Sequence, residues 1–395
     1  MIQIQRKEDC VGCSACVERC PVNCISFERD QQGFRYPQVD TSKCINCSLC
    51  ERVCPVINRQ TPSEPLAVYG AINPDNQIVS ESSSGGIFHA LALNILNRGG
   101  VIFGACFDQN YNVIHSYTES PHELPKFMGS KYVQSDIGSS FLQAENFLKQ
   151  GRKVLFSGTP CQIAGLTLFL RKDYGDLLLK VAVICHGVPS PLVWANYLQE
   201  KIGSPNEISR ISFRDKRHSW SDYGFSYIRQ TGKKEKRHFE FMLDNTYMQA
   251  FLHDITLRPS CFECPAKDGR SRSDIIIGDF WRVKSLEPEI ASKSGTSLIL
   301  INTEAGAKIF EELNIRSKSS TLEKAYISNP ALFQSAKIPM LYDSFWHEYL
   351  QTNSLKTLVK FTRKAQGSFS YRLRQALSIR VRRFVRQVRK KLNKS

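Results

Sequence analysis

Cys10-Val-Gly-Cys13-Ser-Ala-Cys16-Val-Glu-Arg-Cys20-Pro21 decides the fold of the first part of the chain, and its pattern recurs 34 residues later as Cys44-Ile-Asn-Cys47-Ser-Leu-Cys50-Glu-Arg-Val-Cys54-Pro55. Both runs read C-x2-C-x2-C-x3-C-P, a spacing typical of iron–sulfur cluster ligation. Three thiolates at steps of three wrap around one cubane, and the fourth cysteine, beyond the turn, points at the other cluster. Each proline ends a short helix, because its ring cannot continue the hydrogen-bond ladder.

These spacings predict two [4Fe-4S] clusters in a bacterial ferredoxin-like module. The expected ligand sets are Cys10, Cys13, Cys16 and Cys54 for the first cluster, and Cys44, Cys47, Cys50 and Cys20 for the second. Structural zinc is the alternative, but zinc takes two separated pairs of ligands, whereas each run here supplies four cysteines followed by proline. Cys24 lies outside both sets, and we expect a buried thiol that packs against the clusters.

The region between the runs predicts two short strands, residues 24–27 and 34–39, around a turn at residues 30–33. Residues 59–65 form a polar, proline-containing linker. We therefore expect a ferredoxin domain over residues 1–63, a flavin-binding body divided into residues 64–200 and 201–345, and a basic tail over residues 346–395.

The positive charge of the chain is concentrated at its C-terminus. The chain has 53 Lys and Arg against 37 Asp and Glu, but residues 350–395 hold 14 of the basic residues and no acidic one. In a helix, Leu373, Leu377, Val381, Phe384 and Val388 would share one face, with arginines on the other. This basic amphipathic pattern predicts association with an anionic membrane surface, with a partner protein's acidic face or a nucleic acid as alternatives. The nearly neutral body argues against specific nucleic-acid binding.

Composition excludes several other classes of protein. With 42% hydrophobic and 23% charged residues the chain is an ordinary globular one, and no apolar run approaches the roughly 20 residues of a spanning helix. Residues 1–9 lack the apolar core of a signal peptide. Nine of 14 cysteines fall in the first 54 residues at cluster spacings, which indicates a reducing compartment. We expect a cytoplasmic protein, peripheral on the inner face of the membrane.

The body alternates strands and helices, which predicts an α/β fold with a substantially parallel sheet. The expected strands are residues 66–73, 101–107, 153–157, 177–185 and 275–277, and the expected helices are residues 86–97, 138–149 and 162–170. Shorter alternating runs at residues 211–214, 225–229 and 237–242 suit an antiparallel extension. The fold class is therefore mixed α+β and α/β.

Four loops of the body contain residues suited to chemistry. Residues 82–86, Ser-Ser-Ser-Gly-Gly, precede a helix and would seat an anion, with a plain capped turn as the alternative. Cys161, Cys185, Cys261 and Cys264 lie in loops at strand or helix ends and could supply one tetrahedral site; a zinc pair or a C-x2-C redox couple is the alternative. Cys106 is expected in the core. The absence of a G-x-G-x-x-G after these strands disfavours a Rossmann-type NAD site.

In these loops the chain resembles the coenzyme F420 hydrogenase/dehydrogenase beta subunit family. The resemblance covers roughly residues 66–330 and rests on Ser-Ser-Ser-Gly-Gly (82–86), Ser-Lys-Tyr-Val-Gln-Ser (130–135), Gly-Thr-Pro-Cys-Gln (158–162), Cys-His-Gly-Val-Pro-Ser-Pro (185–191), Cys-x-x-Cys-Pro (261–265) and Ser-Asp-x-x-x-Gly-Asp-Phe-Trp (274–281). It implies a bound FAD, an additional [4Fe-4S] cluster and hydride chemistry on a deazaflavin or another reducible substrate. Relatives that reduce chlorophyll-type pigments look similar, as do proteins associated with cell-surface polysaccharide synthesis.

The resemblance also implies roles for individual residues. It makes Cys161, Cys185, Cys261 and Cys264 ligands of a third cluster. Lys131 would neutralise a flavin pyrophosphate or the reduced ring, with a solvated surface lysine as the alternative. His186 and Asp279 are the expected catalytic residues. His186 would donate a proton near the flavin, with a hydrogen bond to a backbone group as the alternative. Asp279 and Trp281 would line the substrate or cofactor pocket, with packing as the alternative for Trp281. The expected flavin-binding residues are Ser83, Ser84, Gly85, Gly86, Lys131, Tyr132, Gly158 and Thr159.

Together these features predict an oxidoreductase that joins one-electron clusters to two-electron flavin chemistry. The expected partners are a redox protein or soluble electron carrier and a small-molecule substrate. A non-enzymatic electron carrier, whose body is only a docking platform, is the alternative function, and a cluster-containing nucleic-acid-binding protein is a third.

Overall fold

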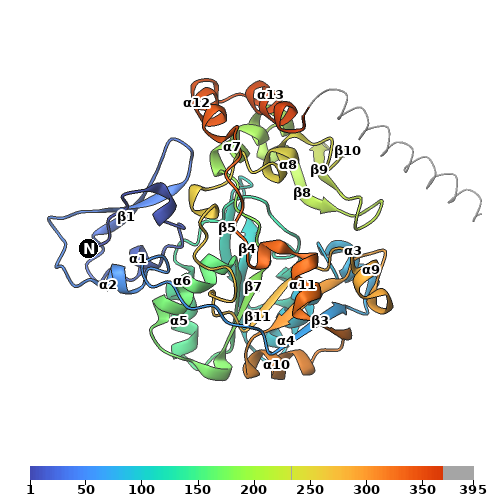
Figure 1. Ribbon diagram of the computed structural model, residues 1–395, viewed down its shortest axis with the longest axis horizontal. Helices are drawn as coiled ribbons and strands as arrows, with labels where there is room; N and C mark the ends of the chain where they lie inside the picture. The colour runs from blue at the N-terminus through green and yellow to red at the C-terminus, as the bar shows by residue number, and fades with distance from the viewer. Residues whose placement is uncertain (233, 368–395) are drawn as a thin grey trace, which may run out of the picture.

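The computed structural model describes residues 1–232 and 234–367, and it places a small N-terminal module beside a larger body (Figure 1). The module contains an antiparallel hairpin and two one-turn helices, as the sequence predicts. Asp30 closes the hairpin turn by accepting a hydrogen bond from the Phe34 N–H at 2.9 Å. The elements are α1 (Ala15–Glu18), β1 (Ile25–Arg29), β2 (Arg35–Val39) and α2 (Leu49–Arg52).

An eight-stranded mixed sheet forms the centre of the body, in the order β13-β3-β12-β11-β7-β6-β4-β5. The expectation of a substantially parallel sheet is right only for β4, β6, β7 and β11; the other four strands pair antiparallel. β5 follows β4 through a tight turn, which permits only antiparallel pairing. The strands are β3 (Ala67–Ile72), β4 (Val101–Phe107), β5 (Val113–Thr118), β6 (Val154–Gly158), β7 (Leu178–Val183), β11 (Ile275–Asp279), β12 (Ser297–Ile301) and β13 (Arg316–Ser320).

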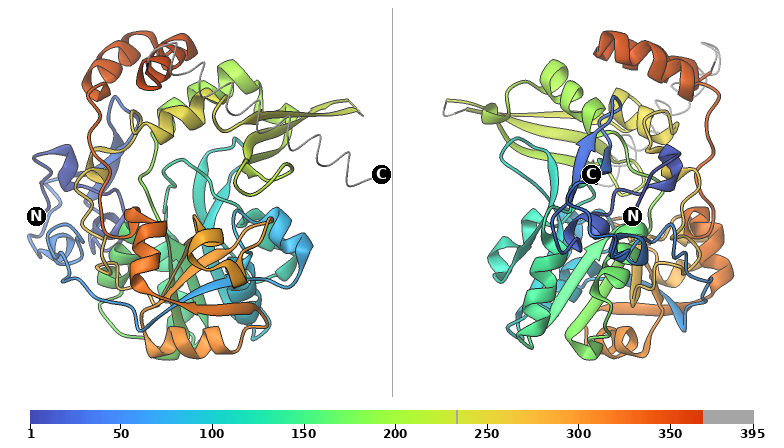
Figure 2. Two further views of the ribbon diagram at one scale, coloured as in Figure 1. Left: turned by 45° about the vertical axis from the view of Figure 1, so that its right-hand side comes forward. Right: turned by 90° about the vertical axis from the view of Figure 1, so that its left-hand side faces the viewer.

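Helices cover both faces of this sheet (Figure 2). Successive residues of the central strands point to opposite faces: Ile102 and Leu155 pack with α4, whereas Phe103 and Phe156 pack with α5 and α6. Burial on both faces explains why these strands are almost wholly apolar. The helices around the sheet are α3 (Asn76–Glu81), α4 (Ile87–Leu96), α5 (Ser140–Lys149), α6 (Pro160–Leu170), α9 (Val283–Leu286), α10 (Glu304–Glu311) and α11 (Leu322–Ser328).

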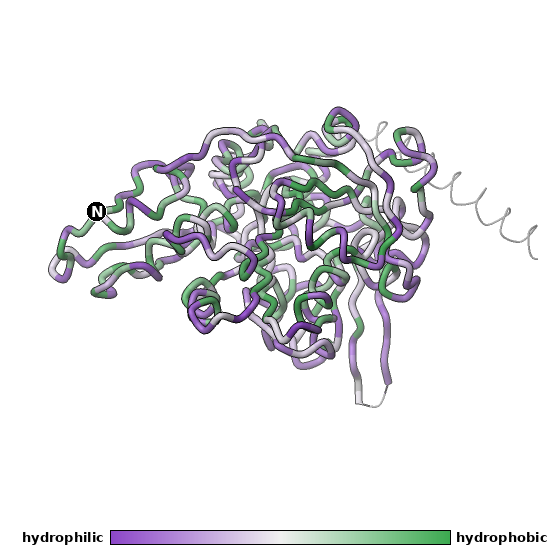
Figure 3. Tube along the Cα trace, turned by 90° about the horizontal axis from the view of Figure 1, so that it is seen from below, coloured by the Kyte–Doolittle hydropathy of each residue, from purple (hydrophilic) through white to green (hydrophobic). Residues whose placement is uncertain are grey.

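A second core joins an antiparallel three-stranded sheet to four helices. Trp194, Phe213, Tyr247 and Phe345 are among its buried aromatic residues. The strand pairing β10-β9-β8 confirms the predicted antiparallel extension, and its β9–β10 hairpin projects from the body as a largely hydrophilic arm (Figure 3). The elements are α7 (Pro191–Tyr197), β8 (Ile208–Asp215), β9 (Gly224–Thr231), β10 (Lys234–Phe241), α8 (Thr246–Leu252), α12 (Tyr342–Thr352) and α13 (Leu355–Ala365).

The expected boundaries after residues 200 and 345 separate elements that pack or pair with each other. Strands from both sides of residue 200 pair in the large sheet, and residue 346 lies inside the buried helix α12. The predicted amphipathic helix of the tail lies in residues 368–395, outside the described residues. Within the part of the chain that the structure describes, no helix is long and apolar enough to cross a membrane.

Candidate functional site

The thiols of the N-terminal module gather around two separate cavities. Both cysteine loops contain residues with positive φ, Gly12 and Ser14 in one and Asn46 and Ser48 in the other, which lets the backbone curl tightly around each cavity. One cavity is lined by Cys10, Cys13, Cys16 and Cys54, and the other is lined by Cys20, Cys44, Cys47 and Cys50. The structure thus brings together the two crossed sets that the sequence spacing predicts.

Burial and mutual repulsion raise the pKa values of several of these thiols. The pKa of Cys13 is raised by burial first and then by the neighbouring Cys16 and Cys54. The same causes, burial and then the charges of Cys10 and Cys54, raise the pKa of Cys16. Thiolates held so close together in an apolar cavity need a cationic centre among them, which fits iron–sulfur ligation.

Cys24 lies beside the second set. Its side chain is buried, its Sγ lies 3.4 Å from that of Cys20, and it lines the same cavity as Cys44. This placement agrees with a thiol packed against a cluster.

A third group of thiols lies at the carboxyl ends of β6 and β7. Cys161 begins α6 directly after β6, and Thr159 caps that helix reciprocally with Gln162. Thr159 Oγ1 lies 3.2 Å from Cys161 Sγ, and Val188 N–H donates to Cys261 Sγ at 3.4 Å. Burial, then the charges of Cys264 and Cys185, raises the pKa of Cys161 to about 12. The structure therefore brings Cys161, Cys185, Cys261 and Cys264 into one group, as expected.

Two residues that are hydrogen-bonded to this third group carry buried cations. Arg258 is only 1% exposed, and its guanidinium donates to two carbonyls and one amide oxygen. Lys267 is 5% exposed and donates to the carbonyls of Cys185 and Ala331. Neither cation pairs with a carboxylate of the described residues. Because unpaired buried charge is unfavourable, these cations fit an anionic group held by the four thiols, such as a thiolate-ligated cluster.

The loop at residues 82–86, expected to bind flavin, is held against the paired strands β3 and β12. Ser84 Oγ donates to the Thr296 carbonyl at 2.9 Å, and Gly85 N–H donates to Ser297 Oγ at 2.9 Å. A Cβ on Gly85 would lie 2.5 Å from the Ala71 carbonyl oxygen, so only glycine fits there. Gly86, with φ +82°, is the N-cap of α4.

The segment with Lys131 and Tyr132 lies against this loop, because Ser130 N–H donates to Ser83 Oγ at 2.7 Å. Lys131 Nζ donates to three backbone carbonyls, and burial lowers its pKa to about 8. The Tyr132 ring stacks on Phe251 with 4.6 Å between ring centroids. Gly158 and Thr159 are the junction of β6 and α6, next to Cys161.

Asp279 and His186 each have a definite partner. Asp279 pairs with the buried Arg214 at 3.1 Å and accepts a hydrogen bond from Trp220 Nε1 at 2.8 Å. His186 Nε2 lies 2.5 Å from Asp254 Oδ1 in a solvent-accessible position. Trp281 stacks on Trp220, with 5.0 Å between ring centroids and 6° between the rings.

Sequence reasoning missed the basic residues of the site. Arg214 also donates to the Ser83 carbonyl, and its Nε has no hydrogen-bond partner among the described residues. Lys216 Nζ donates to carbonyls that include that of Ser84. Arg258 lies three residues before the predicted ligand Cys261, and Lys267 lies three residues after the predicted ligand Cys264. This closeness in sequence is the one feature that could have indicated their place at the site.

The described residues contain no site for a single metal ion: no three His, Cys, Asp or Glu side chains among them converge as ligands of one ion.

Comparisons with known protein families match two parts of the chain. Residues 151–325 match the family described as the C terminus of the coenzyme F420 hydrogenase/dehydrogenase beta subunit, and residues 9–58 match the 4Fe-4S dicluster domain. A search of curated proteins finds no match.

Among solved structures, the chain resembles one from the F420-reducing NiFe hydrogenase complex of Methanosarcina barkeri, studied by xenon derivatization. The two share 15% identity over 77% of this chain and 91% of that chain, with a TM-score of 0.45. By these matches the chain is similar to an iron–sulfur protein related to an oxidoreductase subunit: residues 9–58 resemble the 4Fe-4S dicluster domain, and residues 151–325 resemble the C terminus of the coenzyme F420 hydrogenase/dehydrogenase beta subunit.

Proposed function

We propose that this chain is an iron–sulfur flavoprotein oxidoreductase. In this proposal the two N-terminal thiol sets and the third set each bind a [4Fe-4S] cluster, and the loops beside Asp279 bind FAD. Electrons pass between an external carrier and a reducible small molecule. The substrate class is a deazaflavin or a compound used in cell-surface polysaccharide synthesis.

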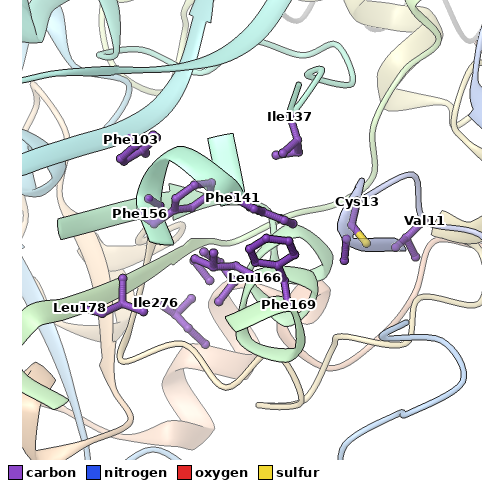
Figure 4. Close-up of a cluster of buried hydrophobic side chains, with 14 of the residues drawn as sticks. Val11, Cys13, Phe103, Ile137, Phe141, Phe156, Leu166, Phe169, Leu178 and Ile276 are labelled. Atoms are coloured by element: carbon purple, nitrogen blue, oxygen red, sulfur yellow. The ribbon is translucent and has the colours of Figure 1, made fainter. Parts of the chain in front are cut away.

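The contact between the N-terminal module and α6 is the observation that supports the relay most strongly. A Cβ on Gly165 would lie only 2.8 Å from Cys13 Sγ, and Gly165 lies one helical turn after Cys161. Figure 4 shows Cys13 close to the packed side chains of Leu166 and Phe169. The first thiol set and the third are therefore neighbours, as one-electron transfer between them requires.

FAD would supply hydride chemistry, and the residues of the chain would bind and orient it. Arg214 is the cation best placed for this role, because it contacts the loop at Ser83 and is held by Asp279. Lys131 already donates to three carbonyls, so we propose that it shapes the adjoining loop. His186 and Asp254 form a solvent-accessible pair that can hold and pass a proton near the Phe251 ring.

The basic segment after residue 367 suits peripheral attachment to an anionic membrane surface, and we propose that it locates the protein there. Its sequence contains ten Lys and Arg residues from 372 to 394 and no acidic residue. Each such residue near an anionic surface contributes about 1 kcal/mol.

Anaerobic purification with quantitation of iron, acid-labile sulfide and flavin tests the proposed function. We expect about 12 iron atoms and one FAD per chain, from three four-iron clusters. About eight iron atoms without flavin would contradict the proposal and favour the non-enzymatic electron carrier.

A further inference from the structure

Arg258 connects the first thiol loop of the N-terminal module to the third thiol group. Its Nε donates to the Cys10 carbonyl at 2.8 Å, while its own carbonyl accepts a hydrogen bond from the Cys261 N–H at 2.9 Å. Gln134 fixes the arrangement from the side: its Oε1 accepts from Arg258 at 3.0 Å and its Nε2 donates to the Val11 carbonyl at 3.1 Å. The guanidinium of Arg258 thus lies against the first thiol loop, while the backbone of the same residue is bonded to the third thiol group.

Arg258 is fixed to both sides of this contact. A Cβ on Gly12 would lie 3.0 Å from Arg258 Nη1, so the guanidinium lies directly against the loop between Cys10 and Cys13. On the other side, the Arg258 backbone N–H donates to the Val188 carbonyl at 3.0 Å, and the Val188 N–H donates to Cys261 Sγ at 3.4 Å. The Tyr36 ring covers it at 4.4 Å from the ring centroid.

Lys267 provides a contrast within the same region. Its Nζ donates a hydrogen bond to the Cys185 carbonyl. Its other hydrogen bond is to the Ala331 carbonyl, which also belongs to the body. Arg258 is therefore the shared cation, and Lys267 belongs to the third thiol group only.

The second thiol set lies on the outer side of the module. Cys44 and Cys47 are only partly buried, and Ile45 between them is 61% exposed, whereas Cys10, Cys13 and Cys16 are buried. An external carrier would thus meet the second set first. The inner pair of sites is the first set and the third group, with Arg258 between them.

We propose that Arg258 is a shared counter-charge for the first and third clusters, which raises the reduction potentials of both and holds them together as the inner pair of the relay. The inference rests on the proposed function. Reduction adds one negative charge to a cluster, so a buried cation nearby favours the reduced form. The step between the two sites moves one electron and no proton, so one cluster is oxidised as the other is reduced.

Redox titration followed by electron paramagnetic resonance tests this role in the full-length protein with its clusters assembled. R258Q removes the charge but keeps groups that can hydrogen-bond to Cys10 and Gln134. R258K keeps the charge and loses the planar fork, and K267Q is the matched control. Iron and flavin contents of the wild type are measured on the same preparations.

We expect R258Q to shift two of the three cluster potentials to more negative values and R258K to leave all three near wild type. K267Q should shift only one. The proposal is overturned if R258Q shifts none or only one, or if R258K shifts the same two clusters as R258Q. If R258Q does not assemble its clusters, R258K decides alone: wild-type potentials support the role of charge, and two shifted potentials overturn it. A wild-type count near eight iron atoms would instead refute the third cluster, independently of these shifts.

Discussion

Replacement of Gly165 by alanine probes the contact on which the relay depends. A Cβ at this position would lie 2.8 Å from Cys13 Sγ and 2.9 Å from Cys13 Cβ, whereas ordinary contact begins at 3.4 Å. The cysteine loop and α6 must therefore separate by roughly 0.6 Å or distort. Overpacking of this kind costs about 1–3 kcal/mol, and alanine's better helix propensity returns about 1 kcal/mol. We expect G165A to destabilise the protein by about 0–2 kcal/mol.

The assay is the rate of iron release to a chelator, together with the melting temperature of the anaerobic protein. T167A on the same helix is the control, because it raises helix propensity at a partly exposed position away from Cys13. We expect faster iron loss in G165A than in T167A. If G165A is stabilised by about 1 kcal/mol and loses iron no faster than the control, Cys13 does not lie against α6 and the reasoning is refuted.

Three further predictions concern the body. C264S should lower the iron content from about 12 to about 8 atoms per chain while the ferredoxin clusters keep their spectra, as measured by iron analysis; a count of 12 would exclude Cys264 as a ligand. D279N should destabilise the protein by about 3 kcal/mol in denaturant unfolding, because it leaves the buried Arg214 without its counter-charge; an unchanged midpoint would contradict this. Burial lowers the pKa of His115 from 6.5 to about 4, so unfolding takes up a proton in this range and stability falls as pH drops through it, by up to about 3 kcal/mol. H115Q should flatten this dependence between pH 7 and pH 5 in anaerobic unfolding, and equal slopes would refute it.

The N-terminal module was the most predictable part of the chain from sequence. Its cysteine spacing is set by the size of the cubane, so local pattern alone indicates which thiols gather, and Cys10 and Cys54 meet in the structure as expected. The central strands were also predictable, because burial on both faces leaves a continuous apolar run, as in β4 at Val101–Phe107.

The edges of the large sheet were not predictable in the same way. The strand β13, Arg316–Ser320, is polar throughout and forms only because it pairs with β3 more than 240 residues earlier in the chain. Such pairing depends on tertiary register, which no local periodicity reveals. The antiparallel pairing of β12 with β11 and with β3 depends on tertiary register in the same way, so the sequence pattern does not reveal it.

The cations of the site were missed for a physical reason. Arginine and lysine are mostly exposed in proteins, so sequence alone favours a surface position for Arg258, Lys267 and Arg214. Their burial, and the absence of a carboxylate beside Arg258 and Lys267 among the described residues, emerges only when distant segments meet. Buried cations near the thiols favour the binding of an anionic cluster at this site.

Anaerobic rapid-mixing spectroscopy tests the central claim most directly, namely that the third thiol group connects the ferredoxin clusters to the flavin. A chemically reduced electron carrier is mixed with wild-type protein and with C264S, and the absorbances of clusters and flavin are followed together. We predict cluster reduction in both proteins but flavin reduction at least tenfold slower in C264S. Equal rates of flavin reduction, or a wild-type preparation that shows no flavin to reduce, would contradict the account.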